Sequence, residues 1–239
     1  MTRRPQVLAT SGGFRPDRRT GMRPGPLVRR ALELSGAQRP RVCLLSTALG
    51  DATEWVARGY AAFSGWSVEL SHLALFPMPN VDDPRAHLLD QDVVWVGGGS
   101  VANLLAVWRV HALDTAFREA WEAGVVLSGV SAGSICWHLG GTTDSFGPDL
   151  QPVTDGLGLL PYANGVHYDS EEQRRPLLHR LVAAGDLPTA YCTDDGVGLH
   201  YVGTDLVEAV TDTAGKAAYH VERDSTGAAA ETRIEPRLL

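Results

Sequence analysis

The feature that most constrains the fold is a regular alternation of short apolar runs with segments of helical spacing over the first 130 residues. Strands are predicted at residues 5–13, 41–48, 66–73, 91–100 and 124–130. Helices are predicted between them at residues 24–36, 51–66, 101–110 and 113–122, with Asp51 as the expected cap of the second helix. Such alternation indicates an α/β fold with a doubly wound, mostly parallel sheet and helices on both faces.

The length and net charge of the chain limit the number of domains and the kinds of partner that we expect. A chain of 239 residues with this pattern is expected to form one domain over residues 1–239, with a polar and loosely held tail from about residue 225. The shorter apolar pieces at 189–193, 196–203 and 217–224 are expected to pair at a sheet edge. A net charge of −7 with scattered arginines argues against a nucleic-acid partner.

The cellular location is predicted from the cysteines and from the absence of targeting signals. Cys43, Cys136 and Cys192 form no CxxC pair, so they suggest neither a disulfide framework nor a metal site, and they fit the cytoplasm. No apolar segment typical of a secretory signal follows the first arginines. Residues 123–143 lack charged side chains but are rich in glycine, serine and threonine, which predicts buried core and no contact with a membrane.

The stretch GVSAG at residues 129–133 carries the strongest chemical signal. It matches G-x-S-x-G between a predicted strand and a predicted helix, an arrangement that exposes a serine hydroxyl on a sharp, strained turn. We therefore expect Ser131 to be a nucleophile, with the amide of Ala132 facing a developing oxyanion. A tight packing turn without chemistry is the alternative.

A second glycine cluster, VGGGS at residues 96–100, ends one strand and begins the next helix. Ser100 is the expected helix cap, and the amide of Gly98 is a candidate second donor to the oxyanion. The cluster lacks the lysine of a P-loop and the third glycine of a dinucleotide fingerprint.

A nucleophilic serine needs a base, and the chain has eight histidines. His167 is the best candidate, because it follows an apolar run and opens a loop. His138 is expected on the same helix as Ser131 and pointing elsewhere. His200 and His220, both in predicted strands, remain the bases of an alternative, an esterase of the α/β-hydrolase type.

Five motifs in order resemble the serine peptidases typified by aspartyl dipeptidase (peptidase E), with cyanophycinases as relatives. The motifs are VGGGS, GVSAGSICW, TTDS, GLGLLPYANGVHYD and CTDDGVGL, within about residues 8–210. The resemblance implies a flavodoxin-like fold akin to class I glutamine amidotransferases and peptide hydrolysis without metal or other cofactor. It also implies Ser131 as nucleophile, His167 as general base and Asp195 as the orienting acid. Asp194 and Asp144 are rivals for that last role, and Asp169 is expected to cap a loop.

This sequence departs from the family's pattern in the segment after His167. That segment is short, and Glu171 stands where an aspartyl dipeptidase provides a substrate-binding arginine, so strict aspartyl specificity is not expected. Glu171 and Glu172 could favour a basic substrate group, whereas Arg174 and Arg175 are expected to be solvated.

The expected partner is a short peptide, and a homodimer is compatible with such a fold. A non-catalytic binding protein of the same fold is the remaining alternative.

Overall fold

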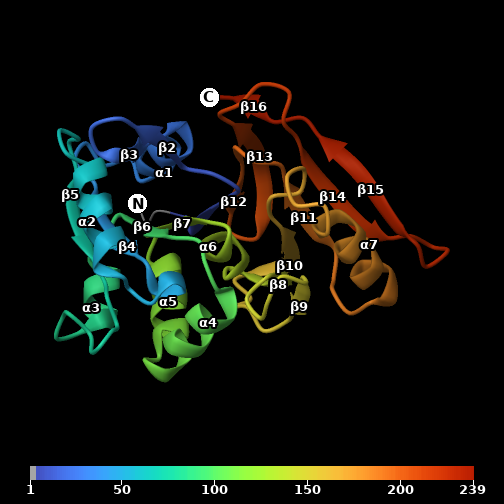
Figure 1. Cartoon of the computed structure of the whole chain (residues 1–239), viewed down its shortest axis with the longest axis horizontal. Helices are drawn as coiled ribbons and strands as arrows, with labels where there is room; N and C mark the ends of the chain where they lie inside the picture. The colour runs from blue at the N-terminus through green and yellow to red at the C-terminus, as the bar shows by residue number, and fades with distance from the viewer. Residues whose placement is uncertain (1–3) are drawn as a thin grey trace.

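The computed structural model describes residues 4–239 and contains a large sheet with a smaller sheet beside it (Figure 1). The large sheet has eight strands in the order β16 (Arg237–Leu238), β13 (Asp205–Thr211), β12 (Val197–Val202), β1 (Gln6–Thr10), β7 (Val126–Val130), β6 (Val93–Val96), β4 (Arg41–Leu45) and β5 (Glu69–His72). The five strands from β1 to β5 in this order are parallel, and β12 pairs antiparallel with β1.

Helices cover both faces of the parallel strands, which confirms the doubly wound α/β fold. Side chains alternate along the strands: Leu8 and Trp95 pack on the face that carries α1 (Pro26–Leu34) and the end of α2 (Thr53–Ala62). Val7 and Val96 pack on the opposite face. That face carries α3 (Pro84–Leu89), α4 (Val101–Val110), α5 (Leu113–Glu122) and α6 (Ala132–Ile135). Helices α4 and α5 begin and end at the predicted residues.

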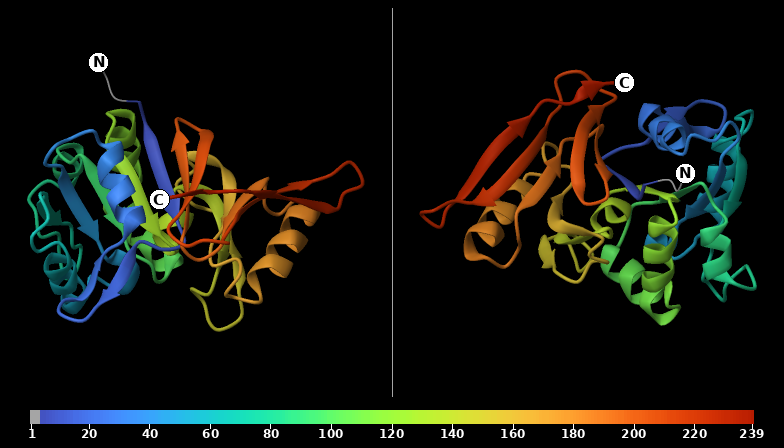
Figure 2. Two further views of the ribbon diagram at one scale, coloured as in Figure 1. Left: turned by 90° about the horizontal axis from the view of Figure 1, so that it is seen from above. Right: turned by 180° about the vertical axis from the view of Figure 1, so that it is seen from behind.

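The smaller sheet departs from the expectation of a single sheet. Its order is β15 (Ala229–Ile234), β14 (Ala218–Arg223), β11 (Ala190–Thr193), β10 (Leu160–Gly165), β8 (His138–Thr143) and β9 (Gln151–Val153). Helix α7 (Arg174–Ala184) packs against it, and Figure 2 shows this part projecting to one side of the parallel sheet. Of the three late segments expected at a sheet edge, β12 joins the parallel sheet. The other two, β11 and β14, have a separate apolar core with α7.

Two local predictions are wrong. The helix after Ser131 ends at Ile135, so His138 begins β8 instead of continuing that helix. Asp51 does not cap α2, whose cap is Ala52. Asp51 sits at φ 53°, and its carboxylate accepts a hydrogen bond from the Leu75 amide at 2.5 Å, so it joins two loops.

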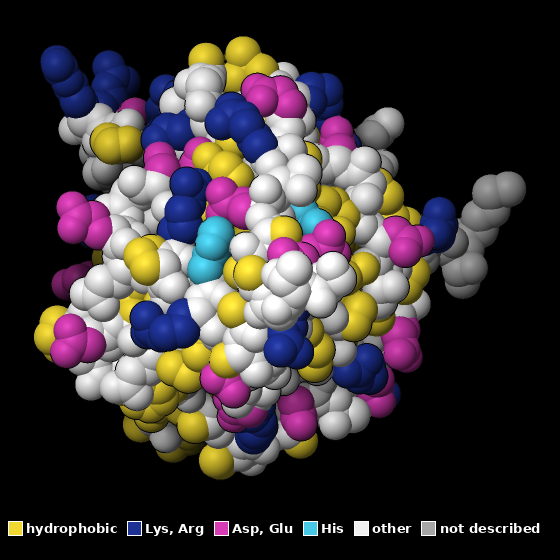
Figure 3. All heavy atoms as spheres, turned by 90° about the vertical axis from the view of Figure 1, so that its right-hand side faces the viewer, with side chains coloured by type: hydrophobic (Ala, Val, Ile, Leu, Met, Phe, Trp, Pro, Cys, Tyr) yellow, Lys and Arg dark blue, Asp and Glu magenta, His cyan; other side chains and the backbone are white. Residues whose placement is uncertain are grey.

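The C-terminal segment is hydrogen-bonded rather than loosely held, although its side chains are largely exposed. Strand β15 pairs antiparallel with β14 along its length, and β16 pairs with β13. On the face formed by this part of the molecule, acidic and basic side chains are interspersed (Figure 3). Within residues 4–239, no helix has the length and apolar character needed to cross a membrane.

A short hairpin, β2 (Phe14–Asp17) and β3 (Gly21–Pro24), was not predicted from the sequence. It follows β1 directly and contacts α2, beyond the carboxyl end of the parallel sheet. Ligands of open α/β sheets bind at that end, so the hairpin lies beside the expected location of the site.

Candidate active site

Ser131 occupies the sharp turn between β7 and α6. Its backbone angles are φ 57° and ψ −113°, one of four positive φ values among the non-glycine residues described. A serine held in so sparsely populated a region indicates a functional constraint, because the surrounding structure must compensate for the strain. Its hydroxyl makes no hydrogen bond to any residue in 4–239, so it is free to react.

The two glycines around Ser131 are required by packing. A Cβ atom at Gly129 would lie 2.5 Å from the carbonyl oxygens of Gly133 and Val96, and one at Gly133 would lie 2.3 Å from the Val96 oxygen. Side chains at either position would overlap the backbone of β6. The G-x-S-x-G pattern therefore exists because the turn presses against the neighbouring strand.

Two backbone amides lie free beside the serine. A Cβ atom at Gly98 would lie 3.2 Å from the Cβ and 3.8 Å from the Oγ of Ser131, so the loop after β6 touches the nucleophile turn. Ala132 is the first residue of α6, where amides have no partner within the helix. Neither amide donates a hydrogen bond to another described residue. The predicted cap at Ser100 is confirmed, since its hydroxyl accepts the Asn103 amide at 3.2 Å.

His167, after β10, and Asp195, after β11, form a hydrogen-bonded pair. The Nδ1 atom of His167 lies 2.6 Å from the Oδ1 atom of Asp195. The exposed fractions of the two side chains, 22% and 44%, leave the pair partly accessible to solvent rather than in the core. Nδ1 bonded to a carboxylate carries the proton, so Nε2 is the nitrogen with a free lone pair.

Two consecutive residues at the end of β1 connect the serine with the histidine. The Thr10 carbonyl accepts the Ser131 amide at 3.1 Å, and the Ser11 hydroxyl accepts the His167 amide at 3.1 Å. Ser11 also exchanges backbone hydrogen bonds with Gly196 and Val197, directly after Asp195. The sequence analysis did not single out Ser11; its signal was a hydroxyl residue in TSGG, at the carboxyl end of the first strand.

The rival Asp194 points away from His167. It is buried, and its Oδ2 atom accepts the Ala217 amide at 2.9 Å and the Tyr219 hydroxyl at 3.4 Å. Burial raises the pKa of Asp194 despite the Ala217 hydrogen bond. Asp194 therefore fastens the loop before β14, whereas the adjacent Asp195 faces the imidazole.

Asp169 bonds the backbone of Asp195 and does not cap its own loop as predicted. Its Oδ1 atom accepts the Asp195 amide at 2.8 Å, and its Oδ2 atom pairs with Lys216. Burial opposes ionisation of Asp169, but the hydrogen bonds from Lys216 and Asp195 outweigh it and lower its pKa. The carboxylate is thus a fixed acceptor beside the His167 loop.

The structure does not bring the other candidates to Ser131. His200 bonds Gln6 at the start of β1 at 3.0 Å, the opposite end of that strand from Thr10. His220 lies on β14, where it stacks on Tyr191 with ring centroids 5.0 Å apart. Asp144 is exposed in the turn after β8. It is Ser145, not Asp144, that bonds the first turn of α4, by accepting the Ala102 amide at 3.3 Å.

Cys43, Cys136 and Cys192 are buried and unpaired. Burial raises the pKa of Cys43 to about 12 and that of Cys136 well above its ordinary value. A thiol in this state is not a competing nucleophile at neutral pH, because the thiolate is the reactive form.

The segment after His167 is short, since α7 begins at Arg174. The expectation of solvated arginines is wrong for Arg174, which is 2% exposed, pairs with Glu171 at 2.7 Å and donates to the Thr142 carbonyl. The Arg175 side chain is 43% exposed and thus partly solvated. Arg175 packs over the rings of Tyr168 and Tyr219 at 4.6 Å. Both arginines join α7 to the smaller sheet, and Glu171 already has a partner.

Comparison with known proteins identifies the family of the chain. The model of peptidase family S51 matches residues 19–209, most of the chain. An uncharacterized peptidase, YgaJ, of Bacillus subtilis (strain 168) is 39% identical over 90% of this chain and 91% of its own. Peptidase E of Shewanella amazonensis is 33% identical over 49% of this chain and 54% of its own. The crystal structure of a peptidase from an acI-B1 Actinobacterium shares the fold, with a TM-score of 0.69 over 98% of this chain and 96% of that chain at 16% identity. The chain belongs to peptidase family S51, and it is a serine-type peptidase.

Proposed function

We propose that the protein hydrolyses short peptides through an acyl-enzyme, with Ser131 as nucleophile, His167 as general base and Asp195 as the acid that orients the imidazole. The amides of Gly98 and Ala132 hold the oxyanion. The observation that carries the proposal is the pairing of His167 with Asp195 on a loop tied to the same end of β1 as Ser131.

The first half of the reaction transfers the acyl group to the serine. The Ser131 Oγ attacks the scissile carbonyl carbon while its proton moves to Nε2 of His167. The negative charge on the carbonyl oxygen is met by the two free amides. The C–N bond then breaks, and His167 gives the same proton to the leaving amine.

The second half returns the enzyme to its starting state. Water gives a proton to Nε2, and its oxygen attacks the ester carbon. The bond between Oγ and the acyl carbon breaks, and the proton returns to Oγ as the peptide acid leaves. Asp195 stabilises the imidazolium in both halves by accepting a hydrogen bond from Nδ1–H, and the proton stays on the nitrogen.

The nucleophile and base are tested first by hydrolysis of a dipeptide and tripeptide panel that contains acidic, basic and neutral N-terminal residues. Wild type is compared with Ser131→Ala and His167→Ala, each checked for an unchanged thermal unfolding temperature. We expect both variants to lose hydrolysis, by about 10³-fold or more. Mass spectrometry of wild type mixed with a small alkyl fluorophosphonate should find one adduct on Ser131.

The esterase alternative makes the opposite prediction for His167. If simple acyl esters are hydrolysed and the rate survives His167→Ala but not His200→Ala, the base has been misassigned. A wild type that neither hydrolyses peptides nor reacts with the fluorophosphonate contradicts the proposal as a whole.

A further inference from the structure

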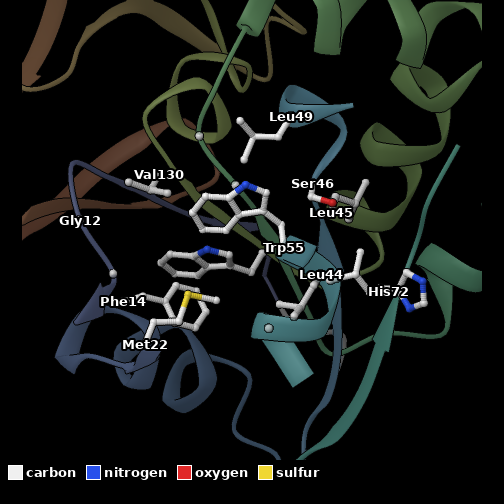
Figure 4. A pocket seen from close by; sticks show the side chains of 16 residues that line it. Gly12, Phe14, Met22, Leu44, Leu45, Ser46, Leu49, Trp55, His72 and Val130 are labelled. Atoms are coloured by element: carbon white, nitrogen blue, oxygen red, sulfur yellow. The ribbon is translucent and has the colours of Figure 1, made fainter. Parts of the chain in front are cut away.

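A large apolar cavity opens directly beside the nucleophile turn. Its volume is about 430 Å³, and Gly98 and Val130, the immediate neighbours of Ser131, are part of its wall. This volume falls within the range of small-molecule sites in proteins. The remaining wall is formed chiefly by large apolar side chains, among them Trp95 and, as labelled in Figure 4, Phe14, Met22, Leu44, Leu49 and Trp55.

The cavity lacks groups that could pair with a charged side chain. Of its 16 lining residues in the described structure, none is an aspartate, glutamate, lysine or arginine. Arg58, one turn along α2, stacks on the Trp55 ring at 4.7 Å from the centroid and does not line the cavity. Among the lining residues, His72 bonds Tyr60 at 3.0 Å with its Nδ1 atom. A charged group placed here would lose its hydration without compensation.

The fold holds this cavity open with rigid elements. Gly13 has φ 154°, and a Cβ atom there would lie 2.4 Å from the Trp95 ring, so the chain passes tightly over that indole into the β2–β3 hairpin. The Phe14 ring meets the Trp95 ring edge-on, with centroids 5.8 Å apart. The hairpin, which the peptidase chemistry does not require, therefore serves as one wall.

The position of the cavity relative to His167 decides which part of a peptide enters it. Strand β7, which ends before Ser131, lies between β1 and β6. The base is tied to Ser11 on the β1 side. Gly98 and most of the cavity wall, which comes from β4, β6, their following loops and α2, lie on the other side of β7, and Gly12, Gly13 and Phe14 complete the wall after β1. In the tetrahedral intermediate the leaving amine must face the base that protonates it. The substituent on the acyl side is the Cα atom of the residue that donates the scissile carbonyl. That residue and its side chain then point towards the cavity.

We propose that this cavity binds the side chain of the residue that donates the scissile carbonyl, and that the enzyme selects large apolar or aromatic residues there. The inference rests on the proposed serine mechanism and names its substrate class. It departs from both an acidic and a basic preference at this position.

Dipeptides of the form X-Ala test the inference, because their only peptide bond places X on the acyl side. The series uses Phe, Leu, Ala, Asp and Lys as X, in free and N-acetylated forms, with Ala-Phe as the reversed control, and released amino acid is measured. We expect kcat/KM for Phe-Ala and Leu-Ala to exceed that for Ala-Ala by about 10- to 100-fold, and Asp-Ala and Lys-Ala to be slowest. A preference for Asp, Lys or Ala, or for Ala-Phe over Phe-Ala, overturns the inference.

A charge placed in the wall provides the second measurement. Trp55 is half-buried near the start of α2, so Trp55→Arg brings a guanidinium to the cavity without replacing a fully buried side chain. We expect kcat/KM for Phe-Ala to fall about tenfold or more and the ratio of Asp-Ala to Phe-Ala to rise. Val110→Arg is the matched control, since Val110 is 82% exposed on α4 and is not among the residues that line the cavity. Equal effects of both variants contradict the inference.

The reaction with the fluorophosphonate distinguishes failure of the specificity inference from failure of the proposed serine mechanism. Labelling of Ser131 together with a preference for charged or small X leaves the serine mechanism standing and removes the apolar pocket as a specificity site. Failure of labelling and of all hydrolysis removes both.

Discussion

The Ser11 hydroxyl accepts a hydrogen bond from the His167 backbone amide at 3.1 Å. The same hydroxyl lies 2.6 Å from the Thr193 hydroxyl, at the end of β11. His167 itself sits at φ 51°, in the left-handed region that non-glycine residues adopt uncommonly. Ser11 therefore joins the parallel sheet to the smaller sheet at the point where His167, the proposed base, is held.

Ser11→Ala should loosen the base without removing any reacting group. The His167 amide loses its acceptor, and a buried unpaired amide costs about 1–3 kcal/mol. We expect kcat/KM to fall about tenfold or more, measured with the best dipeptide. Ser225→Ala, at an exposed turn, is the matched control and should keep wild-type kinetics. Unchanged kinetics in Ser11→Ala show that other contacts suffice to hold His167.

Substitution of Asp195 should reduce catalysis, whereas substitution of its neighbour Asp194 should reduce the stability of the fold. Asp195→Asn removes the charge beside His167 Nδ1, and we expect kcat to fall about 10²- to 10⁴-fold with little change in unfolding temperature. Asp194→Ala leaves the Ala217 amide without its acceptor, and we expect the free energy of unfolding to fall by about 1–3 kcal/mol. A greater loss of kcat in folded Asp194→Ala than in Asp195→Asn reverses the assignment.

Gly98→Ala should impair the oxyanion site by crowding. The added methyl group would lie 3.2 Å from the Ser131 Cβ atom, so either the serine or the Gly98 amide must shift by a few tenths of an ångström. Because oxyanion donors act only at close range, we expect kcat to fall about tenfold or more, with KM less affected. Rates of fluorophosphonate labelling should fall in parallel. An unchanged kcat means that Gly98 is not a donor.

Acid should destabilise the fold through His138. Burial lowers the pKa of His138 to about 4, while its Nδ1 atom bonds the Ser134 carbonyl at 2.9 Å. The unfolded chain binds the proton near pH 6.5, so the free energy of unfolding falls as pH drops from 6.5 to 4 and levels off below. A difference of 2.5 pH units corresponds to about 3 kcal/mol.

Denaturant titrations at several pH values measure this contribution. His138→Phe keeps the ring volume next to Tyr201 but cannot bind a proton, so its stability should change less between pH 6.5 and 4 than that of wild type. His111→Phe, at the end of α4, should retain the wild-type slope. Identical slopes for wild type and His138→Phe contradict the burial argument.

The sequence by itself determined the layered α/β architecture and the reactive turn. Strand and helix periods alternate clearly up to Val130, and both are local properties, so α4 and α5 were placed to the residue. The G-x-S-x-G pattern can also be read directly from the sequence, although the reason for its glycines is the contact of the turn with β6. Beyond Ser131 the predictions were weaker: short strands carry little periodic signal, and the helix after the turn is a single turn long.

Only the tertiary structure decided which aspartate faces His167. Asp194 and Asp195 are adjacent in the sequence and chemically identical. Their side chains diverge because Asp194 is fastened to Ala217 while the Asp195 amide is fastened to Asp169. The link from Ser11 to His167 spans 156 positions, and the cavity beside Ser131 is assembled from segments between Gly12 and Val130. Contacts between distant segments depend on how whole layers pack, and neither propensity nor periodicity along the chain encodes them.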